Sequence, residues 1–388
     1  MSNNLMPVYF NQLPVAFEKG QGVWLWDTNG KKYLDALSGI AVCALGHAHP
    51  TITNTIVYQS SKLLHTSNTY RIPLQEQLAE KLCKISDMEQ VYFCNSGAEA
   101  NETAIKMARL FAREKGVENP KVVTFKDSFH GRSYATLSAS GTARIKEGFE
   151  PLMSGFVPIA QNDIVNLERL LAEDKNIVAI LCECIQGDGG IRALDLAFLQ
   201  HMRRLCDDNE ILMMIDEVQT GLGRTGKWFA FQHAEILPDV VTIAKALGNG
   251  LPVGACLARG KACNLFGPGK HGSTFGGNPL VCAVGLAVID VIEREGILQH
   301  VVSIGDYLLK NLQEVFQHHS QIIDIRGQGL MIGVELASPA FDRVHLGLKH
   351  GVLFNIVANQ VIRLLPPLII QREEIDILIQ RLQRVIEV

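Results

Sequence analysis

The central part of the chain alternates short, continuous apolar runs with helical patterns. Runs without polar alternation are typical of strands buried on both faces of a mostly parallel sheet. Six such runs are Val91–Cys94, Val122–Phe125, Ile177–Cys182, Ile211–Ile215, Val240–Ala244 and Val253–Ala258. Between them, Ala104, Met107, Ala108 and Phe111 keep helical spacing, and Leu196–Cys206 does likewise. This alternation predicts an α/β domain.

The length of the chain predicts more than one domain. Its 388 residues exceed the roughly 250–300 at which a single core stops growing. The C-terminal part combines predicted helices over Leu308–Phe316 and Glu373–Ile386 with strands over Ile322–Ile325, Met331–Leu336, Val352–Asn355 and Val361–Leu364. We therefore expect an N-terminal segment over residues 1–45 that packs with a small domain, a large domain over residues 46–290, and a small α+β domain over residues 291–388.

Composition and charge exclude several classes of partner. The formal net charge is −4, and the basic residues are scattered among acids, so nucleic acid is not expected. The apolar stretch Leu280–Ile289 is far shorter than the ~20 residues that span a bilayer, and Met1–Leu5 lacks the features of a signal peptide. Nine cysteines without a C-x-x-C pair indicate free thiols in a reducing compartment. We expect a cytoplasmic protein with small-molecule partners and no membrane partner.

Polar residues follow four of the apolar runs. Ligands of open α/β sheets bind beyond the carboxyl ends of the strands. The four places are Asn95-Ser96-Gly97-Ala98, Glu183, Asp216-Glu217-Val218-Gln219 and Lys245. We expect these segments to form one site.

Ser96 and Glu99 have the S-x-x-E spacing of a capping box, which predicts that a helix begins at Ser96. The free amides of that helix end suit a phosphate, and Gly97 would let the anion approach the backbone. A plain helix cap is the commoner meaning of such a box, so the motif indicates phosphate only together with the others.

Asp216 and Lys245 each follow a buried strand. A sheltered carboxylate is costly unless it is paired; a pyridinium nitrogen would be a suitable partner for Asp216, and a turn cap or an arginine is an equally good alternative. Lysines are rarely buried. Desolvation and a nearby cation would lower the pKa of Lys245 and supply the neutral amine that Schiff-base chemistry requires. A surface lysine is the alternative, and the convergence of the other three segments argues against it.

Two motifs suggest other chemistry. Gly221-Leu-Gly-Arg-Thr-Gly226 matches the G-x-G-x-x-G of dinucleotide sites, so a nicotinamide-dependent oxidoreductase is the alternative from a different class. Its first glycine lies well past the strand end and no clear amphipathic helix follows, which favours a flexible loop. His47 and His49 form an H-x-H pair without further ligands nearby, so a turn before Pro50 is predicted rather than a metal site.

Five motifs, in this order, resemble those of the class III (subgroup II) aminotransferases, which are fold-type I pyridoxal-phosphate enzymes. They are Asn95-Ser-Gly-Ala-Glu-Ala-Asn101, Phe129-His-Gly-Arg132, Asp216-Glu-Val-Gln-Thr-Gly221, Ala244-Lys-Ala-Leu-Gly-Asn-Gly250 and Gly272-Ser-Thr-Phe-Gly-Gly-Asn-Pro279. The resemblance runs nearly end to end. It implies a large cofactor-binding domain with a mostly parallel sheet plus a smaller α+β domain, and it includes the G-x-G-x-x-G segment as a loop of the family.

The resemblance implies roles for the cofactor residues. Lys245 would hold pyridoxal phosphate as a Schiff base and then act as a general base, while Asp216 would pair with the ring nitrogen. Gly97 and Ala98 would cradle the phosphate, and Phe129 would stack on the ring. The full set implied for cofactor binding is Ser96, Gly97, Ala98, Phe129, Asp216, Glu217, Val218, Gln219, Lys245 and Thr274.

The resemblance also implies a homodimer and a substrate site. Thr274 would reach the phosphate of the neighbouring subunit, with Ser273 beside it in the substrate site. Arg132 would clamp the α-carboxylate of the amino acid, as suits a planar guanidinium. Arg363 would bind the other end of 2-oxoglutarate, with Glu183 as its switchable carboxylate partner.

Within the family, the closest resemblance is to acetylornithine aminotransferases, through Leu37–Pro50 and Ser67–Pro73. It implies transfer of the terminal amino group of N2-acetylornithine to 2-oxoglutarate, giving N-acetylglutamate 5-semialdehyde and glutamate in arginine biosynthesis. Aminotransferases of succinylornithine, succinyldiaminopimelate, ornithine or 4-aminobutyrate are the alternatives. The family usually reads Glu-Pro-x-x-Gly-Glu-Gly-Gly where this chain has Glu183-Cys-Ile-Gln-Gly-Asp-Gly-Gly190, so Cys184 and Asp188 bear on substrate preference.

Overall fold

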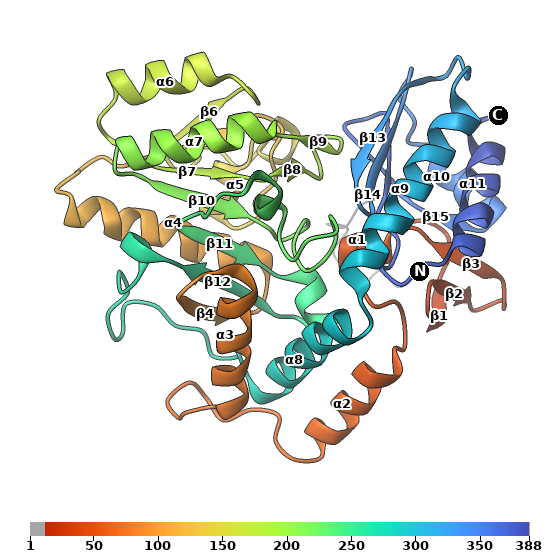
Figure 1. Cartoon of the computed structure of the whole chain (residues 1–388), viewed down its shortest axis with the longest axis horizontal. Helices are drawn as coiled ribbons and strands as arrows, with labels where there is room; N and C mark the ends of the chain where they lie inside the picture. The colour runs from red at the N-terminus through yellow and green to blue at the C-terminus, as the bar shows by residue number, and fades with distance from the viewer. Residues whose placement is uncertain (1–11, 388) are drawn as a thin grey trace.

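The computed structural model describes residues 12–387, so the N-terminal residues Met1–Leu5 considered above lie outside it. A seven-stranded sheet with its helices lies beside a second group of smaller sheets and helices, and this second group contains both the first strands and the last helix of the described residues (Figure 1). Within the described range, none of the helices combines the length and apolar character needed to cross a bilayer. All nine cysteines are free thiols, as predicted.

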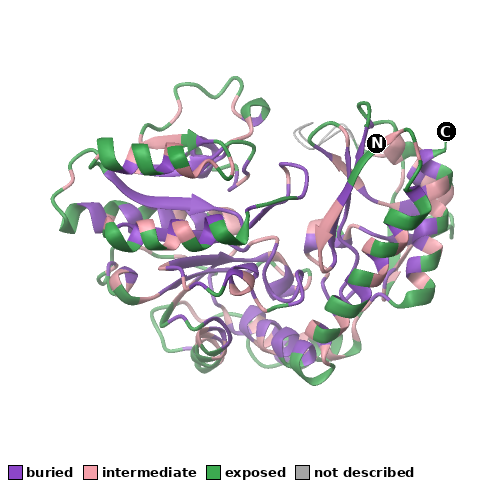
Figure 2. Ribbon diagram, turned by 45° about the horizontal axis from the view of Figure 1, so that its top comes forward, coloured by how far each residue is buried: buried purple, intermediate pink, exposed green. Residues whose placement is uncertain are grey.

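The seven-stranded sheet has the order β4-β12-β11-β10-β7-β5-β6. Its strands are β4 (Gln90–Cys94), β5 (Lys121–Phe125), β6 (Phe156–Ile159), β7 (Ile177–Cys182), β10 (Leu212–Asp216), β11 (Val240–Ile243) and β12 (Gly254–Ala258). All neighbours run parallel except β12, which is antiparallel to both β11 and β4. Strands β7, β10, β11 and β12 are buried along their whole length, which explains their continuous apolar sequences (Figure 2). The predicted α/β fold is confirmed.

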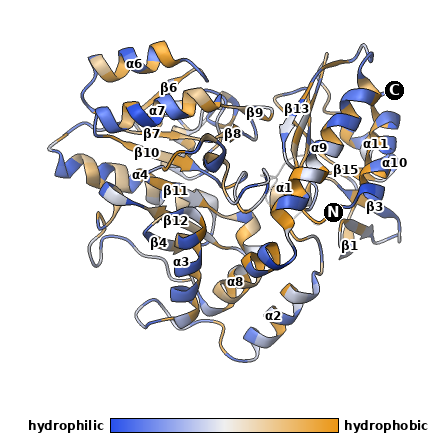
Figure 3. Cartoon of the chain, in the orientation of Figure 1, coloured by the Kyte–Doolittle hydropathy of each residue, from blue (hydrophilic) through white to orange (hydrophobic). Residues whose placement is uncertain are grey.

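Helices cover both faces of this sheet. The elements of this part are α2 (Pro50–Ser60), α3 (Pro73–Ser86), α4 (Gly97–Glu114), α5 (Tyr134–Ala139), α6 (Ile164–Glu173), α7 (Leu196–Asp208), α8 (Pro279–Arg294) and four short 3-10 turns, Ala143–Ile145, Ala230–Ala234, Lys245–Gly248 and Gly260–Ala262. Alternate side chains of β10 point to opposite faces: Leu212 and Met214 join the cluster that contains Phe111 of α4, while Met213 packs in the cluster that contains Phe198 of α7. The apolar strands therefore lie between helices whose outer faces are hydrophilic (Figure 3).

The start of the chain packs with its end. One sheet has the order β13-β14-β17-β16, and another has the order β1-β2-β3-β15. The strands are β1 (Phe17–Gln21), β2 (Trp24–Asp27), β3 (Lys32–Asp35), β13 (Ile322–Gln328), β14 (Met331–Leu336), β15 (Val352–Leu353), β16 (Asn355–Val357) and β17 (Val361–Leu364). The helices are α1 (Ser38–Ala41), α9 (Ile297–Phe316), α10 (Arg343–His350) and α11 (Arg372–Ile386), and a small hairpin joins β8 (Ile185–Gln186) to β9 (Arg192–Ala193). The division of the chain at residues 45 and 290 stays a prediction.

Two details of the strands differ from the sequence analysis. The predicted strand Val352–Asn355 is divided between β15 and β16, which belong to different sheets, because the chain changes sheet at the buried Phe354. Strand β6 was not predicted. It contains Pro158 and lies at the edge of its sheet, which is where a strand tolerates a proline.

Candidate active site

A cavity of about 400 Å³ lies at the carboxyl ends of the parallel strands. The residues singled out from the sequence that line it are Ser96, Gly97, Ala98, Phe129, Arg132, Glu183, Asp216, Val218, Gln219 and Lys245. They come from segments that directly follow β4, β5, β7, β10 and β11. The four strand-end segments therefore form one site, as the sheet topology predicts.

Helix α4 directs its N-terminus into this cavity. Ser96 is the N-cap, and its side chain accepts a hydrogen bond from the Glu99 amide at 3.2 Å, as predicted. Gly97 is pressed against Val218, because a Cβ on Gly97 would lie 2.6 Å from the Val218 Cγ1 atom. The free amides of the first turn and the positive end of the helix dipole suit a phosphate group.

Asp216 is held by three donors in a buried position. Its Oδ2 atom accepts a hydrogen bond from Asn101 Nδ2 at 2.7 Å and lies 2.8 Å from His130 Nδ1, which donates because a carboxylate only accepts. Its Oδ1 atom accepts from the Val218 amide at 2.9 Å. Thr242 fixes the Asn101 amide by donating to its oxygen at 2.7 Å. Among residues 12–387 no arginine pairs with Asp216, so the arginine alternative is wrong.

Sequence reasoning missed Asn101 and His130 as functional residues. Both lie inside motifs that were recognised, Asn95–Asn101 and Phe129–Arg132, but roles were given only to their neighbours. The missing information is spatial, because Asn101 reaches Asp216 from the second turn of α4 and His130 from the loop after β5. Val42 and Asn95 also line the cavity.

Lys245 stands at the end of β11 in an unusual backbone conformation. Its φ is 46°, in the left-handed region that residues other than glycine rarely adopt and that is often retained at functional sites. Burial lowers the pKa of its amine, and the positive charge of Arg363 adds to the effect, although Asp188, Asp216 and Glu183 oppose it. A lysine with a lowered pKa is a better nucleophile near neutral pH.

Arg363 pairs with Asp188. This arginine lies on β17 with only 2% of its side chain exposed, and its Nη1 atom lies 2.7 Å from Asp188 Oδ1. Nη1 also donates to Gln219 Oε1 at 3.2 Å, and Nε donates to Asn355 Oδ1 at 3.1 Å. The prediction that Glu183 is the partner of Arg363 is therefore wrong. Arg363 itself does not line the cavity.

Glu183 has a different set of contacts. It directly follows β7 and lies two residues before β8. Its carboxylate accepts hydrogen bonds from the Phe129 amide at 3.0 Å and from the Gly187 amide at 3.2 Å. Burial raises its pKa to about 7. The turn that begins at Gly187 carries Asp188 away from Glu183 and toward Arg363.

Three other residues named from the sequence lie outside the cavity lining. Glu217 is buried, and its Oε2 atom accepts a hydrogen bond from Thr220 Oγ1 at 2.5 Å; burial raises its pKa to about 7. It supports the loop after β10 instead of lining the cavity. Ser273 accepts a hydrogen bond from Asn95 Nδ2 at 3.1 Å, and Thr274 is exposed.

Arg132 lines the cavity and is exposed. Its guanidinium carbon lies 5.8 Å from the centre of the Phe129 ring. Within the described part of the chain it forms no ion pair, so its charge is available to an anionic ligand.

The two competing motifs have structural roles. His47 lies 2.8 Å from Asp35 Oδ2, and although burial opposes the effect, this hydrogen bond raises the pKa of His47 to about 9. The chain turns at Ala48, so the predicted turn before Pro50 is confirmed. Helix α2 begins at Pro50, with His49 at its N-cap position. Gly221–Gly226 is a loop, but the prediction that it is flexible is wrong, because all six of its residues are buried.

The cavity suits pyridoxal phosphate. The end of α4 offers amides to a phosphate, the fixed carboxylate of Asp216 offers a partner to a ring cation, and Phe129 offers an aromatic face. Lys245 offers an amine to an aldehyde. All four groups line one cavity, and Gly97 leaves no space for a larger side chain there.

Comparison with known families agrees with this arrangement. The model of the family "Aminotransferase class-III" matches residues 6–386 of the chain. The chain belongs to the class-III aminotransferases. Two similar members are acetylornithine aminotransferases: that of Nitrosomonas europaea is 50% identical over 95% of this chain and 93% of its own length, and that of Aquifex aeolicus is 46% identical over 97% and 98%.

Solved structures of class-III aminotransferases have the same fold. The ornithine aminotransferase of Toxoplasma gondii superposes with a TM-score of 0.95 at 32% identity, covering 99% of this chain and 92% of that one. The acetylornithine aminotransferase of Elizabethkingia anophelis has a TM-score of 0.87 at 33% identity, covering 100% and 96%.

Proposed function

We propose that this class-III aminotransferase uses pyridoxal phosphate to move the terminal amino group of N2-acetylornithine to 2-oxoglutarate. The products would be N-acetylglutamate 5-semialdehyde and glutamate, as in arginine biosynthesis. The observation that carries the proposal is the convergence of Lys245, Asp216 and the α4 amides on one cavity. The acetylornithine aminotransferase that is 50% identical over nearly the whole chain supports the choice of donor.

Each residue of the cavity has a task in this proposal. When bound, pyridoxal phosphate supplies an electron sink for the carbon next to the reacting nitrogen. Lys245 would hold the cofactor covalently. Once the donor amine has displaced it, Lys245 would take the proton from that substrate carbon and deliver it to the cofactor carbon to which the lysine had been bound, a task that suits its lowered pKa. Asp216 holds a positive charge on the ring nitrogen, and His130 and Asn101 keep Asp216 in position.

Two arginines offer places for the carboxylates of the substrates. Arg132 is free and exposed at the cavity, so it suits the single carboxylate of N2-acetylornithine. A dicarboxylate such as 2-oxoglutarate requires a second cation. Arg363 can serve if the incoming carboxylate replaces Asp188, which is the carboxylate paired with it at 2.7 Å. In this way one cavity accepts substrates of different charge.

Ornithine is the second candidate donor, because the T. gondii ornithine aminotransferase has a TM-score of 0.95 with this chain. The two donors differ at the α-nitrogen, which is a neutral amide in N2-acetylornithine and an ammonium group in ornithine. Succinylated donors and 4-aminobutyrate differ from them in size and charge.

We also propose that the enzyme is a homodimer in which Thr274 reaches the phosphate of the neighbouring subunit. Thr274 is exposed and does not line the cavity of its own chain. The adjacent Phe275 has 62% of its surface exposed, and Tyr58, Leu64 and Tyr70 are exposed hydrophobic residues in the α2–α3 region. Exposed apolar side chains of this size favour contact with another copy of the chain.

The test is a comparison of donors in separate half-reactions. The protein, loaded with pyridoxal phosphate, is mixed with N2-acetylornithine, ornithine, 4-aminobutyrate or succinylornithine, and the visible absorbance of the bound cofactor is followed. We expect N2-acetylornithine to have the highest kcat/KM and 2-oxoglutarate to restore the starting spectrum. A faster reaction with another donor would overturn the substrate assignment, and failure to bind pyridoxal phosphate would overturn the whole proposal.

A further inference from the structure

The Gly221–Gly226 loop contains a buried arginine that neither the cofactor nor the substrate proposal uses. Arg224 is 2% exposed and is among the largest fully buried side chains. None of the six loop residues lines the cavity. A buried guanidinium is costly unless its donors are used. Nη2 of Arg224 has no hydrogen-bond partner among the described residues, so the partners of Nη1 indicate what the loop does.

The guanidinium of Arg224 binds the ends of two strands. Nη1 donates to the carbonyl oxygen of Leu330 at 3.0 Å and to that of Pro366 at 2.5 Å. Leu330 immediately precedes β14, and Pro366 follows β17. These strands are antiparallel neighbours, and Ile332 pairs with Leu364, so both carbonyl groups lie at the same end of the strand pair.

Arg363 lies one residue before the end of β17. Its register partner on β14 is Gly333. The two carbonyl groups that Arg224 binds therefore lie at the same end of the β14–β17 pair as Arg363, the proposed substrate arginine. The backbone strengthens this contact, because the Leu330 amide donates to the Arg224 carbonyl at 3.0 Å.

The start of the loop, at Gly221, follows the residues that line the cofactor side of the cavity, Asp216, Val218 and Gln219. The Gly221 amide donates to the Glu217 carbonyl at 2.9 Å, directly after Asp216. Gln219, two residues before the loop, accepts a hydrogen bond from Arg363 itself. One short segment thus bonds at its start to Glu217, the residue after the proposed ring partner, and through Arg224 to the ends of β14 and β17.

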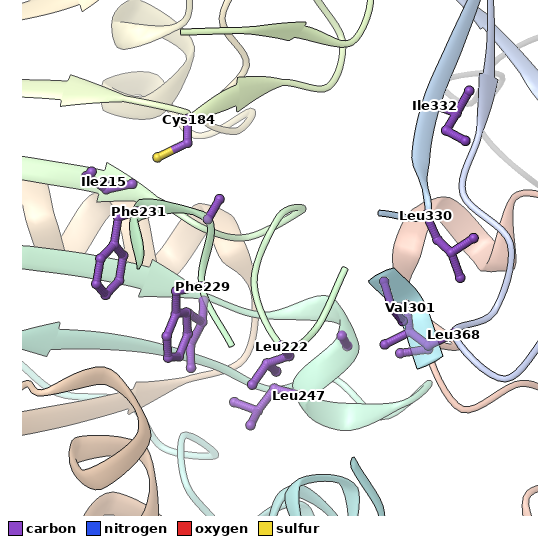
Figure 4. Close-up of a cluster of buried hydrophobic side chains, with 14 of the residues drawn as sticks. Cys184, Ile215, Leu222, Phe229, Phe231, Leu247, Val301, Leu330, Ile332 and Leu368 are labelled. Carbon is purple, nitrogen blue, oxygen red and sulfur yellow. The ribbon is translucent and has the colours of Figure 1, made fainter. Parts of the chain in front are cut away.

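Close packing makes the loop a rigid connection. A Cβ on Gly226 would lie 2.5 Å from Val302 Cγ2 of α9, and one on Gly223 would lie 3.2 Å from the side chain of Leu368. Leu222 belongs to the buried hydrophobic cluster that also contains Leu247, Val301, Leu330 and Leu368, all of which are labelled in Figure 4. The glycines let the backbone fit where side chains would collide.

We propose that Arg224 is a positioning residue that fixes Arg363 relative to the cofactor side of the cavity, and so sets the affinity for dicarboxylate substrates. Arginine suits this task because the two N–H bonds of its planar Nη1 group point in fixed directions, one toward each carbonyl oxygen, whereas the ammonium group of lysine is a point charge on a flexible chain. The inference rests on the proposed function only in its use of Arg363 as a carboxylate site.

The experiment measures binding of glutarate, a dicarboxylate that cannot be transaminated. Calorimetric titration of the loaded enzyme compares the wild type with Arg224→Met, which keeps an unbranched, though shorter, side chain and removes the guanidinium. We expect the glutarate Kd to rise about tenfold, a size typical of residues that act through another residue. The same substitution in an Arg363→Ala background should have no further effect on glutarate.

The donor half-reaction with N2-acetylornithine is the control, and we expect Arg224→Met to leave its rate nearly unchanged. An unchanged glutarate Kd, or an equal loss in the Arg363→Ala background, would overturn the inference. If Arg224→Met does not fold, Arg224→Lys is used and judged by the same criteria. A wild type that binds glutarate but does not react with N2-acetylornithine would refute the proposed donor alone, because the glutarate titration reports on Arg224 independently of the donor.

Discussion

Asp188→Asn should strengthen the use of 2-oxoglutarate. The substitution keeps the shape of the side chain but removes the charge that competes with the substrate for Arg363. A charge-assisted hydrogen bond such as this 2.7 Å contact is worth about 1.5–3 kcal/mol. The side chain of Asp188 is 36% exposed, so solvent screening favours the lower end of that range. About 1.4 kcal/mol corresponds to a tenfold change, and we expect the KM for 2-oxoglutarate to fall about tenfold.

The assay separates the two half-reactions by stopped-flow absorbance. The donor half-reaction with N2-acetylornithine should be nearly unchanged in Asp188→Asn, because a donor with one carboxylate does not need Arg363. Glu183→Gln is the matched control, since the carboxylate of Glu183 contacts backbone amides and not Arg363. The reasoning fails if Asp188→Asn leaves the KM for 2-oxoglutarate unchanged or raises it, or if Glu183→Gln produces the decrease instead.

Three further results are expected. Lys245→Ala should abolish turnover and prevent attachment of the cofactor by borohydride reduction, as followed by mass spectrometry; wild-type turnover in this variant would exclude Lys245 as the catalytic amine. Gly97→Ala should weaken pyridoxal-phosphate binding by about tenfold or more in a titration, because its Cβ would lie 2.6 Å from a Val218 methyl group, whereas Gly267→Ala, where nothing lies within 4 Å, should not; equal affinities in the two variants would contradict the tight packing at Gly97. His47 has a folded-state pKa of about 9 against 6.5 for the free side chain, so its contribution to the free energy of unfolding is fully present below pH 6.5 and is lost as the pH rises through 9. The stability difference between wild type and His47→Asn should shrink by about 3 kcal/mol over this range in urea titrations, and a constant difference would show that His47 is not charged in the folded state.

The sequence predicts the fold well where burial alone decides the pattern. Strands β7, β14 and β17 begin and end where the apolar runs do, because each is buried along its length. The start of α4 is equally clear, since Ser96 and Glu99 form a local cap. Strand β6 was not predicted because it contains a proline, which a strand tolerates at the edge of a sheet, and the sequence does not show which strand lies at the edge.

The partners of charged residues depend on contacts between distant segments. Glu183 and Asp188 are five residues apart and both follow β7, so sequence alone does not decide which of them meets Arg363. The turn at Gly187 decides it. In the same way, the burial of Arg224 depends on Leu330 and Pro366, more than a hundred residues further along the chain.

The pairing of β3 with β15 has a consequence for how the protein is made. This pairing joins Leu34 to Val352 in a parallel ladder. The N-terminal strands leave the ribosome first, and during synthesis one edge of β3 has no partner until the segment around residue 352 follows it. Open strand edges invite pairing with other chains. A chain that ends before residue 352 therefore keeps an unpaired strand edge and lacks Arg363, so the segment from β15 to β17 both supplies the proposed substrate arginine and covers an edge prone to aggregation.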